Sequence, residues 1–218
     1  MMATGFAFFR RCAGLALVLA PPLAHAQSSG PAPPVQVAAG AGFLTSGAYF
    51  TGPGRLALDA GDAFAGALQL SVTVSRELAV VGSVAHARPG WRLTGVPLVG
   101  AVAVPGGSLW FADAALRGQA RLGPAVRAPV AFAQAGAGLA RYSLSTSLLG
   151  TAIDEHATNF ALALGAGLAL PLGSRLGLEV MAKDYIASFE SVRDLAALGV
   201  EGRRAHTVVL LVSGRVGL

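Results

Sequence analysis

The chain has 218 residues, with 16 lysines and arginines against 11 acidic residues, and 54% of its residues are hydrophobic. Charged residues make up only 12%, whereas an ordinary soluble domain has about 25%. This leaves too little charge to cover a water-facing surface. No cluster of basic and aromatic residues indicates nucleic-acid binding, and the single cysteine excludes a framework of disulfides within the chain.

Residues 1–26 predict a secretory signal peptide. Arg10 and Arg11 precede an apolar run that begins at Cys12, and Ala24-His25-Ala26 has the small-residue pattern of a cleavage site. Residues 27–34 are rich in proline and predict a flexible periplasmic lead-in. We therefore assign residues 35–218 to the folded domain.

Eight segments show the alternation of residue types that is typical of β-strands. In chain order they are Val35–Phe50, Ala63–Ser75, Leu78–Arg88, Leu109–Leu122, Val130–Thr146, Ala157–Leu172, Leu176–Phe189 and Ala205–Gly217. Short turns alternate with longer loops, which are predicted at residues 51–62, 89–108, 147–156 and 190–204. This alternation is typical of a membrane barrel inserted from the periplasm, with both termini on the periplasmic side.

The alternation is clearest in the segments 157–172 and 176–189. Large apolar residues such as Phe160, Leu164 and Leu178 hold the even positions, while small or polar residues hold most of the odd ones. A transmembrane helix over residues 157–174 has the required length, but three glycines and Pro171 would weaken it. A lipid-facing helix also has no reason to sort its residues by parity. We therefore interpret the two segments as a hairpin.

The predicted fold class is an all-β, eight-stranded antiparallel up-and-down transmembrane β-barrel. Closure of the barrel would satisfy every backbone group within lipid. The alternative is a soluble barrel with its two faces reversed. That barrel would present water with a surface of alanine, glycine and serine that carries few charges, which is poor for solubility.

Charged residues at lumen-facing positions predict an interior polar network. Its members are Asp113, Arg117, Arg121, Glu179, Lys183 and Arg215. If the loop 190–204 closes symmetrically, Glu179 lies opposite Arg215 and the two form an ion pair. We interpret the network as charges that neutralise one another in a narrow, packed lumen. A narrow polar path for small solutes is the alternative.

Aromatic residues near the long loops predict an interfacial girdle. They are Tyr49, Phe64, Trp91, Trp110, Tyr142, Phe160, Tyr185 and Phe189.

No residue pattern predicts a catalytic, cofactor or metal site. The histidines at 86, 156 and 206 lack the His-x-Ser pattern of lipid A deacylases. His156 lies beside Asp154 and Glu155, but a zinc site usually gathers three or four well-spaced ligands, so a solvated loop is the preferred interpretation. The glycines fall within strands and form no phosphate-binding loop.

The last strand carries a more specific pattern. Val208, Leu210, Val212, Val216 and Leu218 share one face of the terminal segment. This pattern resembles the C-terminal insertion signal that the barrel assembly machinery reads in outer-membrane barrels, here at Val212, Val216 and Leu218. Such signals usually end in Phe or Trp, and this chain departs from them by ending in Leu.

Together with the signal peptide and the segment 133–142, the last strand resembles the small bacterial outer-membrane β-barrel family, which includes OmpA-type barrel domains and the OmpX-like porin family. The resemblance implies an integral outer-membrane protein in contact with outer-membrane lipid and lipopolysaccharide, and with the assembly machinery during insertion. We predict a non-enzymatic structural or surface-interaction role through long extracellular loops. The alternatives are a narrow porin-like channel for small solutes or ions and, third, a lipid-modifying barrel enzyme.

Overall fold

The computed structural model describes residues 35–52, 57–96, 100–104, 106–125, 127–148, 151–188 and 201–218. The predicted signal peptide, the predicted lead-in and Phe189 lie outside these residues. No helix within the described ranges is long and apolar enough to cross a membrane.

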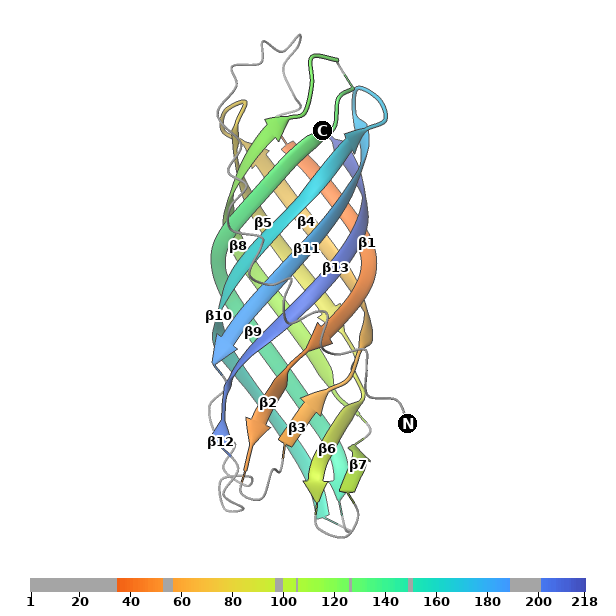
Figure 1. The fold of residues 1–218 in the computed structure, drawn as a ribbon, viewed down its shortest axis with the longest axis vertical. Helices are drawn as coiled ribbons and strands as arrows, with labels where there is room; N and C mark the ends of the chain where they lie inside the picture. The colour runs from red at the N-terminus through yellow and green to blue at the C-terminus, as the bar shows by residue number, and fades with distance from the viewer. Residues whose placement is uncertain are drawn as a thin grey trace.

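Eight strands form a closed barrel in the order β1-β13-β11-β10-β9-β8-β5-β4 (Figure 1). Their bounds are β1 Val35–Ser46, β4 Ala63–Thr73, β5 Leu78–Ala87, β8 Ser108–Arg121, β9 Val130–Leu148, β10 Thr151–Pro171, β11 Leu176–Ser188 and β13 Arg204–Gly217. All neighbours are antiparallel, including β1 and β13, which close the ring. The predicted fold class is therefore confirmed.

The two faces of each barrel strand differ as the alternation predicted. In β4, Leu68 and Leu70 face outward and are 50% and 48% exposed, whereas Gln69 and Ser71 face inward and are each 6% exposed. Large apolar residues therefore cover the outer wall, and small or polar residues line the lumen. This is the arrangement of a membrane barrel, and the soluble barrel with reversed faces is wrong.

Short turns join the strands at one end of the barrel, which we call the short-turn end. At the turn between β4 and β5, the backbone nitrogens of Val74 and Ser75 donate to the Leu78 carbonyl, at 2.9 and 3.0 Å. The first and last barrel strands also meet here, since the backbone nitrogen of Leu218 donates to the Val35 carbonyl at 2.9 Å. The predicted clustering of tight turns at one end is confirmed.

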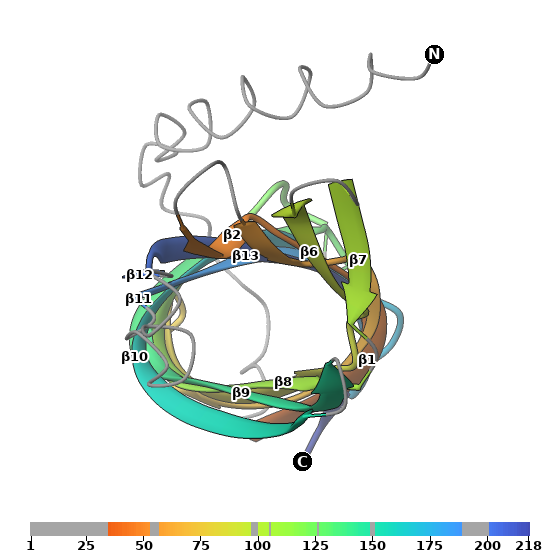
Figure 2. The same ribbon diagram turned by 90° about the horizontal axis from the view of Figure 1, so that it is seen from below.

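The opposite end carries a second sheet, of five strands in the order β12-β2-β3-β6-β7. The bounds are β2 Ala48–Thr51, β3 Ala57–Ala60, β6 Trp91–Val96, β7 Gly100–Val104 and β12 Glu201–Gly202. This sheet extends the barrel away from the short turns (Figure 1), and Figure 2 shows β2, β6 and β7 along one side of the ring. We call this end, with the sheet, the extended end.

Three sequence predictions for the extended end are wrong. The first predicted strand is divided at Gly47 into β1 and β2, and strands occupy parts of the predicted loops 51–62, 89–108 and 190–204. The predicted loop 147–156 is largely a continuation of β9 and β10, whose pairing extends to Thr151 opposite Leu148. These segments contain short alternating runs, and Gly95 and Gly100, both with φ near 79°, permit the tight connection between β6 and β7.

Glycines allow the close approach of neighbouring strands inside the barrel. A Cβ atom at Gly138 of β9 would overlap the Ala112 carbonyl oxygen of β8 and lie 2.6 Å from Asp113 Cα. By contrast, a Cβ at Gly82, on the outer face of β5, would meet nothing within 4 Å. The small inward residues therefore hold β8 and β9 at the spacing that positions Asp113 in the lumen.

Candidate functional site

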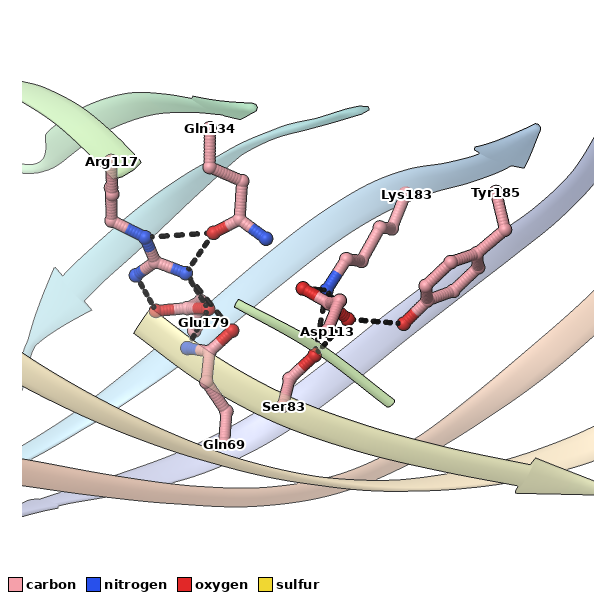
Figure 3. A network of polar contacts seen from close by, with 8 residues as sticks. All are labelled: Gln69, Ser83, Asp113, Arg117, Gln134, Glu179, Lys183 and Tyr185. Carbon is pink, nitrogen blue, oxygen red and sulfur yellow. Dashed lines mark hydrogen bonds and ion pairs between the residues drawn. The ribbon is translucent and has the colours of Figure 1, made fainter. Parts of the chain in front are cut away.

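The lumen contains two layers of paired charges (Figure 3). In the layer nearer the short turns, Arg117 of β8 forms an ion pair with Glu179 of β11, with Nη1 2.9 Å from Oε2. The same guanidinium donates to Gln134 Oε1 of β9 at 2.8 and 3.0 Å and to Gln69 Oε1 of β4 at 3.1 Å. Arg117 also lies over the Phe132 ring, 3.9 Å from its centroid. Four strands are thus joined across the lumen.

The second layer is centred on Asp113 of β8. Lys183 of β11 donates from Nζ to both carboxylate oxygens, at 2.6 and 2.8 Å. Ser83 of β5 donates to Oδ2 at 2.6 Å, and the Tyr185 hydroxyl donates to the same oxygen at 3.0 Å. Lys183 also donates to Ser83 Oγ at 2.6 Å. The carboxylate therefore has three side-chain donors.

These charges are buried and compensated. The side chains of Arg117 and Glu179 are 3% and 2% exposed, and those of Lys183 and Asp113 are 1% and 0% exposed. Burial of charges is costly unless each is paired and also hydrogen-bonded, and every one of these four groups meets that condition. A cavity of ≈ 10 Å³ beside Gln69, Glu179 and Lys183 has room for about one water molecule. The middle of the lumen is therefore filled.

Buried aromatic side chains pack together at the extended end of the barrel. The rings of Phe50 and Tyr142 join β2 to β9, with centroids 5.8 Å apart, and Tyr49 contacts Trp91 at 5.4 Å. Phe111 stacks on Tyr185, with centroids 4.3 Å apart, next to Asp113 on its extended-end side. We call the first four residues the aromatic plug, which lies on the extended-end side of the two charged layers.

The aromatic plug corrects the predicted interfacial girdle. Tyr49, Trp91, Tyr142 and Tyr185 were assigned to the membrane interface, but they are 0–3% exposed and face inward. The alternation along each strand explains why Tyr142 and Tyr185 face inward. Tyr142 is at an even position of β9, where Gln134 and other even positions face inward. Tyr185 is at an odd position of β11, and the odd positions of that strand face inward. We assigned Tyr142 and Tyr185 to the interface because they lie near loops. The alternation along their strands would have predicted correctly that they face inward.

Three of the predicted girdle residues do face outward. Phe64, Trp110 and Phe160 are 66%, 49% and 62% exposed. Phe43, which the prediction missed, is 65% exposed and contacts Phe64 edge to face, with centroids 5.7 Å apart. Residue 189, also predicted for the girdle, lies outside the described residues.

Four of the six predicted network residues lie in the two layers, and the other two, Arg121 and Arg215, lie nearer the short-turn end. Arg121 is at the short-turn end, where it donates to the Ala125 carbonyl at 3.2 Å. The predicted register of Arg215 is wrong, because Glu179 lies opposite Ser213 and Arg215 lies opposite Gly177. The prediction assumed that Phe189 faces Ala205, whereas Ala187 holds that position.

The network also contains residues that the sequence prediction missed. They are Gln69, Ser83, Gln134 and Tyr185. Each is a polar residue at an inward position of its strand, so parity was the signal that could have found them. Val212, Val216 and Leu218, of the predicted insertion signal, lie on the outer wall and are 56%, 45% and 68% exposed.

The charged layers offer little scope for catalysis. Ser83 and Lys183 are in contact, but Lys183 Nζ is also paired with Asp113 at 2.6 Å. The adjoining cavity of ≈ 10 Å³ cannot hold a substrate. Within the described ranges, no group of three or more His, Cys, Asp or Glu side chains could hold a metal ion.

A closed eight-stranded barrel with an apolar outer wall and a filled polar lumen has the fold of small outer-membrane β-barrel proteins. Neisserial surface protein A is similar, with a TM-score of 0.55, 14% identity and coverage of 87% of this chain and 100% of that chain. OprG from Pseudomonas aeruginosa has a TM-score of 0.54, 11% identity and coverage of 86% and 98%. The outer membrane protease OmpT from Escherichia coli has a TM-score of 0.48, 6% identity and coverage of 84% and 96%.

The likenesses to Neisserial surface protein A and to OprG, both with TM-scores above 0.5, show that the chain has the fold of these outer-membrane barrels. No protein-family model matches the chain, and no curated protein matches it either.

Proposed function

We propose that the protein is a non-enzymatic, non-conducting barrel of the bacterial outer membrane with a structural or surface-interaction role. It is exported with the signal peptide predicted at residues 1–26. The barrel assembly machinery inserts it, and the outward-facing Val212, Val216 and Leu218 serve as the insertion signal. The extended end faces the exterior, as the longer connections of small barrels do.

The observation that carries this proposal is the filled lumen. The ion pairs Arg117–Glu179 and Lys183–Asp113 cross the barrel between facing strands. The aromatic plug lies between these ion pairs and the extended end. A conducting path would have to separate buried ion pairs, and removal of one partner from such a pair costs about 3–5 kcal/mol. This disfavours the narrow channel, which is the alternative function.

The extended end supports a surface-interaction role. Its five-stranded sheet and the long β9–β10 hairpin project away from the short-turn end (Figure 1). Rings from both parts pack against each other, as in the contact of Phe50 with Tyr142. The extended end is thus an ordered structure, which can present a rigid surface to a binding partner.

Conductance in planar bilayers tests the proposal. Protein refolded in detergent is first checked by gel mobility in SDS, because a folded barrel shifts on boiling. Wild-type protein that shows this shift should give no conductance steps, while a sixteen-stranded porin in the same bilayer should give them. Regular steps that scale with salt concentration would support the channel instead.

A further inference from the structure

The outer wall carries a basic, hydroxyl-rich patch at the extended end, on the side formed by β5, β8, β9 and β10. We define the headgroup patch as Arg88, Ser108, Trp110, Arg141, Ser143 and His156. Cross-strand pairing places Trp110 beside Arg141, and Ser143 lies between Ser108 and His156. Arg88 follows Ala87, which pairs with Leu109, so Arg88 emerges next to Ser108.

The patch is hollowed and accessible. Ser108, Trp110, Arg141 and Ser143 line a hollow of ≈ 370 Å³ on the outer wall. The two serine hydroxyls share a hydrogen bond of 2.8 Å. The Trp110 side chain is 49% exposed, and its ring packs on His86 with centroids 4.2 Å apart. An aromatic ring and two hydroxyls therefore line the same hollow as Arg141.

The patch carries two exposed arginines. Arg88 and Arg141 are both exposed. Among the described side chains of β5, β8, β9 and β10, no acidic residue faces outward. The guanidinium groups of Arg88 and Arg141 make the patch suited to an anion.

An apolar row adjoins the patch on its membrane side. Cross-strand pairing aligns Val84, Ala112, Leu139 and Phe160 in sequence across the same four strands. Val84, Leu139 and Phe160 are 41%, 52% and 62% exposed. A ligand that fits both rows has an anionic head and long apolar chains, which free phosphate lacks.

We propose that the headgroup patch binds the phosphorylated sugar head of an outer-leaflet glycolipid of the lipid A class. Arg88 and Arg141 bind its phosphates, because the guanidinium group matches phosphate geometry with two parallel hydrogen bonds. Ser108 and Ser143 bind sugar oxygens, and Trp110 packs against the sugar ring. The acyl chains lie along the apolar row below. Basic pockets at a membrane surface bind lipid headgroups in the same way.

The test uses full-length protein refolded in phosphatidylcholine nanodiscs. The probes are bisphosphorylated lipid A and the same lipid A with both phosphates removed, and retained lipid is counted by native mass spectrometry after titration. The variant is the double substitution Arg88→Gln and Arg141→Gln. The matched control is Arg204→Gln, an exposed arginine at the start of β13 at the same end of the barrel. Gel mobility checks the folding of each protein.

Wild-type protein and Arg204→Gln should retain bisphosphorylated lipid A equally, and the double variant should bind it roughly tenfold or more weakly, since each tenfold corresponds to about 1.4 kcal/mol. Equal binding by the double variant would overturn the proposal. Equal retention of the dephosphorylated lipid would also overturn it, because acyl chains alone would then account for binding. Displacement of lipid A by millimolar inorganic phosphate would indicate a simple anion site instead. The conductance test has no bearing on these outcomes, so each proposal can fail alone.

Discussion

The substitution Glu179→Gln tests how far the ion pairs of the lumen stabilise the barrel. Glutamine has nearly the shape of glutamate, so the change removes a charge without leaving a cavity. Arg117, whose side chain is 3% exposed, would keep its hydrogen bonds to Gln134 and Gln69 at 2.8 and 3.1 Å. It would lose its carboxylate partner, and its charge would remain buried.

Removal of one partner from a buried ion pair costs about 3–5 kcal/mol. The glutamine oxygen can still accept one of the two hydrogen bonds that Glu179 accepts from Arg117 at 2.9 and 3.1 Å. We therefore expect the lower end of this range, a loss of about 3 kcal/mol in the free energy of unfolding. This corresponds to more than a hundredfold in the folding equilibrium, since about 1.4 kcal/mol is tenfold.

The assay is reversible urea unfolding in lipid vesicles, followed by the fluorescence of the two tryptophans and by gel mobility. The control is Glu77→Gln in the exposed turn between β4 and β5, which should change the free energy of unfolding by less than about 0.5 kcal/mol. The double substitution Arg117→Met and Glu179→Met should recover most of the loss, because replacement of a whole buried pair by apolar residues is often neutral. A loss below about 1 kcal/mol for Glu179→Gln would refute the reasoning, since Arg117 would then be compensated by water or another group.

Two further predictions concern backbone spacing and pH. Gly138→Ala should prevent or strongly slow folding because the new methyl group would lie 2.6 Å from Asp113 Cα, whereas Gly82→Ala should fold normally, having nothing within 4 Å; gel mobility after refolding compares the two. Burial raises the pKa of Asp59 in the extended-end sheet above its ordinary 3.8, and the charge of Arg92 opposes this shift. The folded carboxyl thus keeps its proton to higher pH than the unfolded one, so stability falls as pH rises through the range just above 3.8. Asp59→Asn should remove that fall in urea titrations at several pH values.

The sequence by itself determined the architecture of the membrane-spanning part. In a strand, successive side chains point to opposite faces, so the parity of Leu68 and Gln69 reports the faces of β4 without knowledge of any other strand. Short turns are equally local, because few residues can connect two paired strands. For these reasons the number of barrel strands, their antiparallel order and the apolar outer wall could all be predicted.

Only the tertiary structure decided which inward charges meet. Glu179 pairs with Arg117, three strands away around the barrel, and this contact depends on the register of every strand between them. The predicted pair with Arg215 was wrong because a change of two residues in register at one loop moved Ser213 opposite Glu179. The alternation in a sequence fixes the face of a residue, but its height along the lumen comes from the register of all the strands.

The extended end shows the same limit. Tyr49 and Trp91 were predicted to lie at the membrane interface because they are near loops. Both are buried where β2, β3 and β6 form a further sheet beyond the barrel. That sheet brings together segments from three separate connections, so its core is absent from any one local pattern. The headgroup patch likewise combines residues of β5, β8, β9 and β10, whose alignment follows from cross-strand pairing. Local alternation determines a face, and closure of the barrel determines the neighbours on it.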